Sequence, residues 1–174
     1  MKKQAFTKTK SLITALVVVI LLLVAYFIYS RPMTLSQINP LLPLDKCVGI
    51  SGYYRTSDDA EGLLQFTIEA DSEEFKELCS LFNEKTYRRS LKDLLPRGTR
   101  IHQTTGEFEF QWEVLFHFDT IEFPDGNAGS GPLLQIQYWY GELDIENRVF
   151  EKERRICHTA EQDAWAKEIL DIIR

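Results

Sequence analysis

Three histidines are the side chains in this chain best suited to acid–base or metal chemistry, and they are far apart in the sequence. His102, His117 and His158 lack the spacing of metal ligands. His117 follows Glu113 by four residues in a strand-like stretch, so the two side chains would share one face and could exchange a proton or hold a metal. An exposed histidine near a glutamate needs no ligand, and we prefer that simpler interpretation.

Two short motifs also invite a chemical interpretation. Cys157-His158 pairs a nucleophile with a base, but adjacent strand residues point to opposite faces and cannot meet. Asp125-Gly126-Asn127 resembles the start of a calcium loop, but the late glutamate of such a loop is missing and a hairpin turn explains it better. The chain contains no GxSxG, HExxH, Walker or GxGxxG motif. We expect no catalytic residue, no metal site and no cofactor.

The chain has three cysteines, an odd number that cannot pair completely within one molecule. Cys79 falls on an apolar helical stripe and is expected to be a small buried hydrophobe. Cys47 opens one predicted strand and Cys157 closes another. A disulfide between Cys47 and Cys157 is open at this point, because it depends on a distance that the sequence does not contain.

Charged side chains form two groups after residue 84. Four carboxylates near the strongest strand pattern could bind a cation, could mark a solvent-exposed face, or could pair with basic residues of a neighbouring strand. The last two interpretations need no ligand and are preferred. The carboxylates are Glu107, Glu109, Glu113 and Asp119, and the basic residues are Lys152, Arg154 and Arg155.

The second group is a basic island, in which Asp93 is the one acidic residue between positions 85 and 100. Such an island could dock an acidic protein or an anionic lipid headgroup, or it could be a solvated helix end and loop. It is our candidate contact site. Its residues are Lys85, Arg88, Arg89, Lys92, Arg97 and Arg100, of which the last five are the predicted partner-binding residues.

An uncharged apolar run, Leu12 to Tyr29, must position all of these residues relative to a membrane. As a helix its eighteen residues would reach ~27 Å, close to the thickness of a bilayer core. Lysines precede the run and no acidic residue occurs before position 32, so the N-terminus is predicted to be cytoplasmic. A cleaved signal peptide is the alternative, but cleavage after Ser30 would put the large Ile28 at the minus-three position.

The domain organisation follows from these boundaries. We expect a cytoplasmic basic tail (1–11), a transmembrane helix (12–30), a stiff proline-containing connector (31–46) and one exported domain (47–174). Residues 32–174 carry 26 acidic and 15 basic side chains, a net charge of −11. This sign argues against nucleic acid as a partner, because phosphate contacts need cations.

Alternating and helical patterns predict the elements of the exported domain. Strands are expected over 47–54, 64–69, 107–118, 134–140 and 148–156, with turns at 57–62, 124–132 and 144–147. A helix is expected from Asp71, capped by Asp71 and Glu74, and another over 160–173, with a capping box of Thr159 and Gln162. The order is β-β-α-β-β-β-α. We predict an α+β fold with an antiparallel sheet of five or six strands and helices packed on one face.

This order of elements resembles the small single-pass exported domains of unknown function found in Gram-positive bacteria. The resemblance covers roughly residues 47–173, and it rests on the element order, on the helix followed by Tyr87-Arg88, and on the closing helix after Cys157-His158. It implies a cell-envelope setting and no particular activity.

Taken together, these features predict a membrane-anchored extracytoplasmic binding domain, with the bilayer as one partner through residues 12–30 and another envelope protein as the second. Two alternatives are kept. One is an envelope enzyme with scattered active-site residues, for which Glu113 and His117 are the guess. The other is a carrier or sensor of a small hydrophobic ligand, for which a cavity lined by Trp112, Phe116 and Tyr138 would be the sign.

Overall fold

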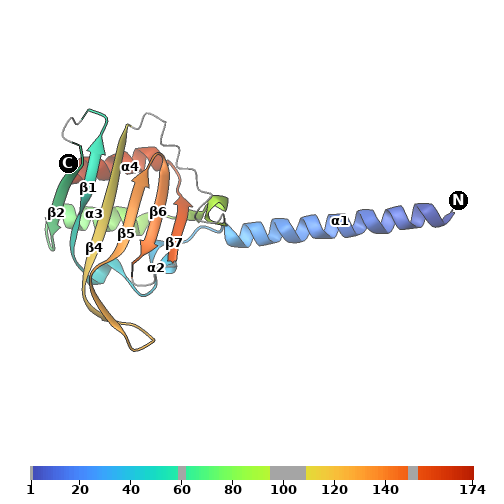
Figure 1. Ribbon diagram of the computed structural model, residues 1–174, viewed down its shortest axis with the longest axis horizontal. Helices are drawn as coiled ribbons and strands as arrows, with labels where there is room; N and C mark the ends of the chain where they lie inside the picture. Colours follow the sequence, from blue (N-terminus) through green and yellow to red (C-terminus); the bar gives the residue numbers. More distant parts are fainter. Residues whose placement is uncertain (1, 59–61, 95–108, 149–152) are drawn as a thin grey trace. The chain divides into compact units, whose positions relative to one another are not determined.

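The computed structural model describes residues 2–58, 62–94, 109–148 and 153–174, drawn in colour in Figure 1. The chain divides into two compact units, Met1–Arg31 and Pro32–Arg174.

The first unit is one helix, α1 (Lys2–Tyr29). Its segment Leu12–Tyr29 has a mean hydropathy of 2.9, and none of this segment is buried against protein. By length and composition this helix can cross a membrane, as a signal sequence near an N-terminus also could. The predicted apolar helix is therefore confirmed as a helix.

The second unit is built on one antiparallel sheet, whose seven described strands have the order β2-β1-β4-β5-β6-β7-β3 (Figure 1). The prediction of an α+β fold with an antiparallel sheet is confirmed, but the predicted five or six strands are too few. The strands are β1 (Cys47–Thr56), β2 (Leu64–Glu69), β3 (Arg88–Arg89), β4 (Phe110–Glu122), β5 (Ala128–Trp139), β6 (Glu142–Asn147) and β7 (Glu153–His158).

Two predicted hairpins are present. Strands β1 and β2 pair in register from Gly49–Glu69 to Tyr54–Leu64. Strand β4 pairs with β1 on one side and with β5 on the other, and it has the alternating burial that its sequence predicts. The turn between β4 and β5 is shorter than predicted, since β5 already begins at Ala128.

The predicted element order is wrong around β6. The turn-forming types of Asp144 and Asn147 predict a turn over 144–147, but these residues belong to a strand. Leu143 and Ile145 are fully buried, so the alternation of apolar and polar side chains prevailed over the turn preference. The order also gains β3, a two-residue strand too short to show a pattern, and β7 begins at Glu153 rather than Arg148.

Four α-helices occur in the described chain: α1, α2 (Leu35–Ile38), α3 (Glu73–Glu84) and α4 (Gln162–Ile173). Short 3₁₀ turns occupy Leu44–Lys46 and Leu91–Leu94. Helices α3 and α4 lie together on one side of the sheet, as predicted (Figure 1). Segment 33–44, in the predicted connector, contributes buried side chains to the core, namely Met33, Leu35, Ile38, Leu42 and Leu44.

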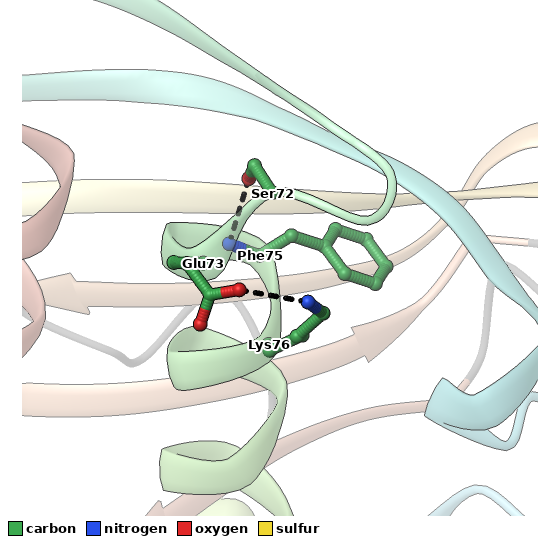
Figure 2. Close-up of polar contacts among 4 residues, drawn as sticks. All are labelled: Ser72, Glu73, Phe75 and Lys76. Atoms are coloured by element: carbon green, nitrogen blue, oxygen red, sulfur yellow. Dashed lines mark hydrogen bonds and ion pairs between the residues drawn. The ribbon is translucent and has the colours of Figure 1, made fainter.

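The start of α3 differs by one residue from the prediction. Ser72, not Asp71, is the N-cap, and its Oγ accepts a hydrogen bond of 3.0 Å from the backbone N–H of Phe75 (Figure 2). Asp71 has a φ of +70° and serves in the turn before the helix. At α4 the predicted capping box of Thr159 and Gln162 is wrong, because the N-cap is Glu161 and Gln162 is already the first residue of the helix. The backbone N–H of Thr159 donates to Gln162 Oε1, while the Thr159 hydroxyl donates to the Thr86 carbonyl.

An aromatic cluster between the helices and the sheet is the centre of the core. Phe82 of α3 is fully buried, and its ring centroid lies 5.2 Å from Phe116, 5.4 Å from Trp165 and 6.1 Å from Trp112. All three contacts are edge-to-face, the geometry that aromatic rings prefer. The indole Nε1–H of Trp112 donates to the Ala166 carbonyl, which ties β4 to α4.

Candidate functional site

The sheet face opposite α3 and α4 carries mostly polar side chains, and we call it the open face. In Figure 1 both helices lie behind the strands that carry it. Register places its side chains in rows across β1, β4, β5 and β6. Its members on these four strands are Ser51, Tyr53, Arg55, Gln111, Glu113, Leu115, His117, Gln135, Gln137, Trp139, Glu142, Asp144 and Glu146.

One row of the open face runs from Tyr53 through Glu113 and Gln137 to Asp144. A neighbouring row contains Arg55 and Gln111, which face each other across β1 and β4. Extending the β4–β5 register one residue beyond the Trp112–Tyr138 pair places Trp139 beside Gln111.

His117 has a partner that the sequence analysis did not identify. Its Nε2 lies 2.7 Å from the hydroxyl of Ser51, on the neighbouring strand. Burial lowers the pKa of the His117 imidazole, which favours the neutral ring. A serine and a neutral histidine in hydrogen-bond contact are two members of a nucleophile–base arrangement. The pairing depends on register between residues 66 positions apart, which has no signal in the sequence.

Glu113 and His117 share the open face, but no carboxylate is among the causes of the His117 pKa shift. Burial raises the pKa of the Glu113 carboxyl, Arg148 opposes this and Glu146 adds to it. The hydrogen bond of His117 thus goes to Ser51, and the charges that act on Glu113 are those of Arg148 and Glu146.

The polar atoms and rings of the open face differ in exposure. Gln111 is 6% exposed, and its Oε1 has no hydrogen-bond partner among the residues that the structure describes. Tyr53 and Trp139 are the exposed aromatic side chains of this face, each 37% exposed.

The basic island is divided by the structure. Arg88 is exposed on β3, while Arg89 is half-buried opposite Cys157. Lys85 lies with its Nζ 5.9 Å from the ring centroid of Trp165, a cation–π contact. The side chain of Lys92, and all of Arg97 and Arg100, lie outside the described residues.

Two exposed leucines follow β3 closely. Leu91 is 56% and Leu94 is 64% exposed, both on the 3₁₀ turn next to β7. We call Arg88, Leu91 and Leu94 the Arg88 corner. It combines a cation on a sheet edge with exposed apolar surface.

Of the two preferred interpretations of the acidic group, pairing with Arg154 and Arg155 on a neighbouring strand is wrong, while exposure to solvent holds for its described members other than half-buried Glu113. Glu107 and Lys152 lie outside the described residues, and only the backbone of Arg154 is described. Arg154 and Arg155 are on β7, which is separated from β4 by β5 and β6. Register instead places Arg154 opposite Glu146 of β6. Glu109 and Asp119 are exposed to solvent.

None of the three cysteines, all of which lie in the described part of the chain, forms a disulfide. The Cys47–Cys157 disulfide is excluded by topology, because β1 and β7 are four strand spacings apart, or ~19 Å. A disulfide needs Cα atoms within about 7 Å. Cys79 is half-buried on α3, and its burial raises the pKa of its thiol to about 12, with a smaller contribution from Cys47.

The remaining motifs have structural roles. Asp125 accepts hydrogen bonds from the backbone N–H and the side-chain amide of Asn127, within the turn between β4 and β5. No group of three potential metal ligands occurs among the described residues.

Trp112, Phe116 and Tyr138 are buried in the packed core. His158 is exposed while Cys157 is buried, so these adjacent residues do point to opposite faces; His102 is not described.

A surface cleft of about 670 Å³ lies between α3 and α4. Its lining is acidic, with Lys167 as the one cation in it, and this is the composition of two solvated helix faces. The lining residues are Glu74, Glu77, Ala164, Lys167, Glu168, Asp171 and Ile172.

Comparison of the chain with known protein families, with curated proteins and with solved structures finds no match.

Proposed function

We propose that this chain is a membrane-anchored binding domain that contacts an acidic protein of the cell envelope through the Arg88 corner. The observation that carries the proposal is the combination of exposed Arg88 with Leu91 and Leu94, which are 56% and 64% exposed. Arginine is enriched in protein interfaces, the buried centres of interfaces are more apolar than the rest of the surface, and exposed leucines are costly to leave in water. An acidic partner complements the cation.

The proposal includes an orientation. Helix α1 crosses the membrane with the lysine-rich N-terminus in the cytoplasm, and the second unit lies outside. Protease added to intact cells should then remove residues after the span and leave the N-terminal tail protected. A C-terminal half that survives the protease until the cells are lysed would refute this orientation.

The contact is tested by site-specific photo-crosslinking of the full-length chain in its native membrane. A probe in place of Leu91 should yield a protein adduct, and a probe at exposed Lys76 of α3 should not. The charge reversal Arg88→Glu should reduce the Leu91 adduct at least fivefold. The matched reversal Lys167→Glu, on α4, should leave the adduct unchanged.

Lipid adducts at Leu91 in place of protein adducts would show that the corner contacts headgroups, and would refute the protein partner. Equal protein adducts from Leu91 and Lys76 would also refute it, because they would indicate non-specific collision.

A further inference from the structure

We propose that the open face of the sheet is a binding site for an uncharged glycan chain. Two aromatic rings stack on the apolar C–H faces of its sugars, and the amides and the carboxylate between the rings hydrogen-bond its hydroxyl groups. This site is separate from the Arg88 corner, and it rests on the proposed function only in that the domain lies outside the cell, where envelope glycans are found.

The two rings are Tyr53 and Trp139, and both are accessible at 37% exposure. Tyr53 is on β1 and Trp139 is on β5, with β4 between them. Two strand spacings and two residues along the strand separate their Cα atoms by ~12 Å. A single sugar ring cannot contact both side chains, so the geometry fits an extended chain of sugars.

The surface between the rings is made of planar hydrogen-bonding groups. Glu113 faces Tyr53 across one ladder and Gln137 across the other. Gln111 lies on the same strand as Glu113, in the neighbouring cross-strand row, where it faces Arg55 of β1. Amides offer both donors and acceptors, and a carboxylate offers acceptors, so this set can bind neighbouring hydroxyl groups of one sugar.

Gln111 supplies an independent sign that this face is incomplete without a ligand. Gln111 is only 6% exposed. The Oε1 atom of its side chain has no hydrogen-bond partner among the described residues. A buried amide oxygen without a hydrogen bond costs free energy, and few such groups occur in native proteins. A ligand hydroxyl donating to this oxygen would remove the cost.

The composition of the face argues against other classes of ligand. A protein interface has a contiguous apolar centre, whereas here each aromatic ring is isolated among polar groups. A nucleic acid or an anionic headgroup needs clustered cations, whereas Arg55 and Arg148 stand among several carboxylates. A sugar has apolar ring faces and hydroxyl edges, and it carries no charge that must be matched.

The test uses the full-length chain in detergent micelles and isothermal titration with two uncharged hexasaccharides, chitohexaose and cellohexaose. Saturable binding of at least one is expected. Trp139→Ala and Tyr53→Ala should each weaken it at least tenfold, while Leu91→Ala, which removes an exposed side chain outside the open face, should leave it unchanged. Because both aromatic side chains are partly exposed, the variants should keep the melting temperature of the parent chain within a few degrees.

Absence of saturable binding to both hexasaccharides would overturn the proposal, and so would binding that survives both aromatic substitutions in folded protein. These outcomes are independent of the Arg88 corner. Failure of the crosslinking experiment with intact glycan binding would reject the protein partner alone, and the reverse result would reject the glycan site alone.

Discussion

Replacing Gly52 with alanine should separate two strands that the rest of the domain depends on. Gly52 lies in β1, opposite Val114 of β4 and Phe66 of β2. A Cβ built at this position would lie 1.9 Å from the backbone carbonyl oxygen of Glu113 and 2.8 Å from the Phe66 ring. Ordinary C···O contacts in sheets are about 3.3–3.6 Å, so the backbones must move apart by more than ~1 Å.

The expected cost follows from what is in the way. Overpacking a core costs roughly 1–3 kcal/mol. The upper end applies here because a backbone oxygen, unlike a flexible side chain, cannot rotate aside. We expect Gly52→Ala to lower the free energy of unfolding by ~3 kcal/mol, which for a domain of this size lowers Tm by ~10 °C.

Gly49→Ala is the matched control, in the same strand and between the same neighbours. A Cβ at Gly49 would meet only the Ile68 carbonyl oxygen within 4 Å, at 3.8 Å, an ordinary contact. The substitution should be neutral, or stabilising by about 0.4–1 kcal/mol, because alanine restricts the unfolded chain.

Both variants are measured as full-length chains in detergent, by urea and thermal unfolding followed through tryptophan fluorescence. Buried Trp112 and Trp165 report directly on the core next to the sheet. If the two variants have the same midpoint within error, or if Gly49→Ala is the more damaging, the close approach of β1 and β4 is wrong.

Two further outcomes are expected from the same unfolding assay. Ser72→Ala should lower the free energy of unfolding by ~1 kcal/mol, because it removes the hydrogen bond that caps the backbone N–H of Phe75. Lys76→Ala breaks an exposed ion pair with Glu73 and should have no measurable effect. A larger loss of stability from Lys76→Ala than from Ser72→Ala would contradict the assigned cap. Burial holds the pKa of the Cys79 thiol at about 12 against 9.0 in the unfolded chain, so its contribution to stability is complete below pH 9 and is lost as the pH rises towards 12. Cys79→Ala should therefore make the alkaline fall in unfolding midpoint shallower, and parallel curves for the two proteins would refute the burial of that thiol.

Local patterns predicted the elements whose signal is contained in a few consecutive residues. The apolar run Leu12–Tyr29 is long enough to indicate a helix that could span a membrane. The alternation of apolar and polar residues in β4 continues over enough residues to indicate a strand. The same reasoning failed at β6, where the polar residues of an alternating strand were also turn formers. It failed at Ser72 because neighbouring Asp71 offered an equally good cap, and the choice depends on how the preceding turn bends.

The candidate sites were less predictable than the elements. Glu113 and His117 were singled out on one strand, but the actual partner of His117 is Ser51, and the actual charge near Glu113 is Arg148. Tyr53 and Trp139 carried a signal that was not used: Tyr53 alternates with the apolar side of its strand together with Ser51, and Trp139 does so together with Gln135 and Gln137, which predicts that both rings lie on the polar face.

The sequence by itself determined the apolar helix, the α+β class and the alternation that gives the sheet one buried side, because each depends on interactions between residues close in the chain. Tertiary structure alone decided which strands far apart in the sequence are neighbours. Strand order places β1 beside β4, keeps Cys47 far from Cys157, and assembles the open face from residues dozens of positions apart. Register between distant strands is set by packing of the whole core, and no local pattern encodes it.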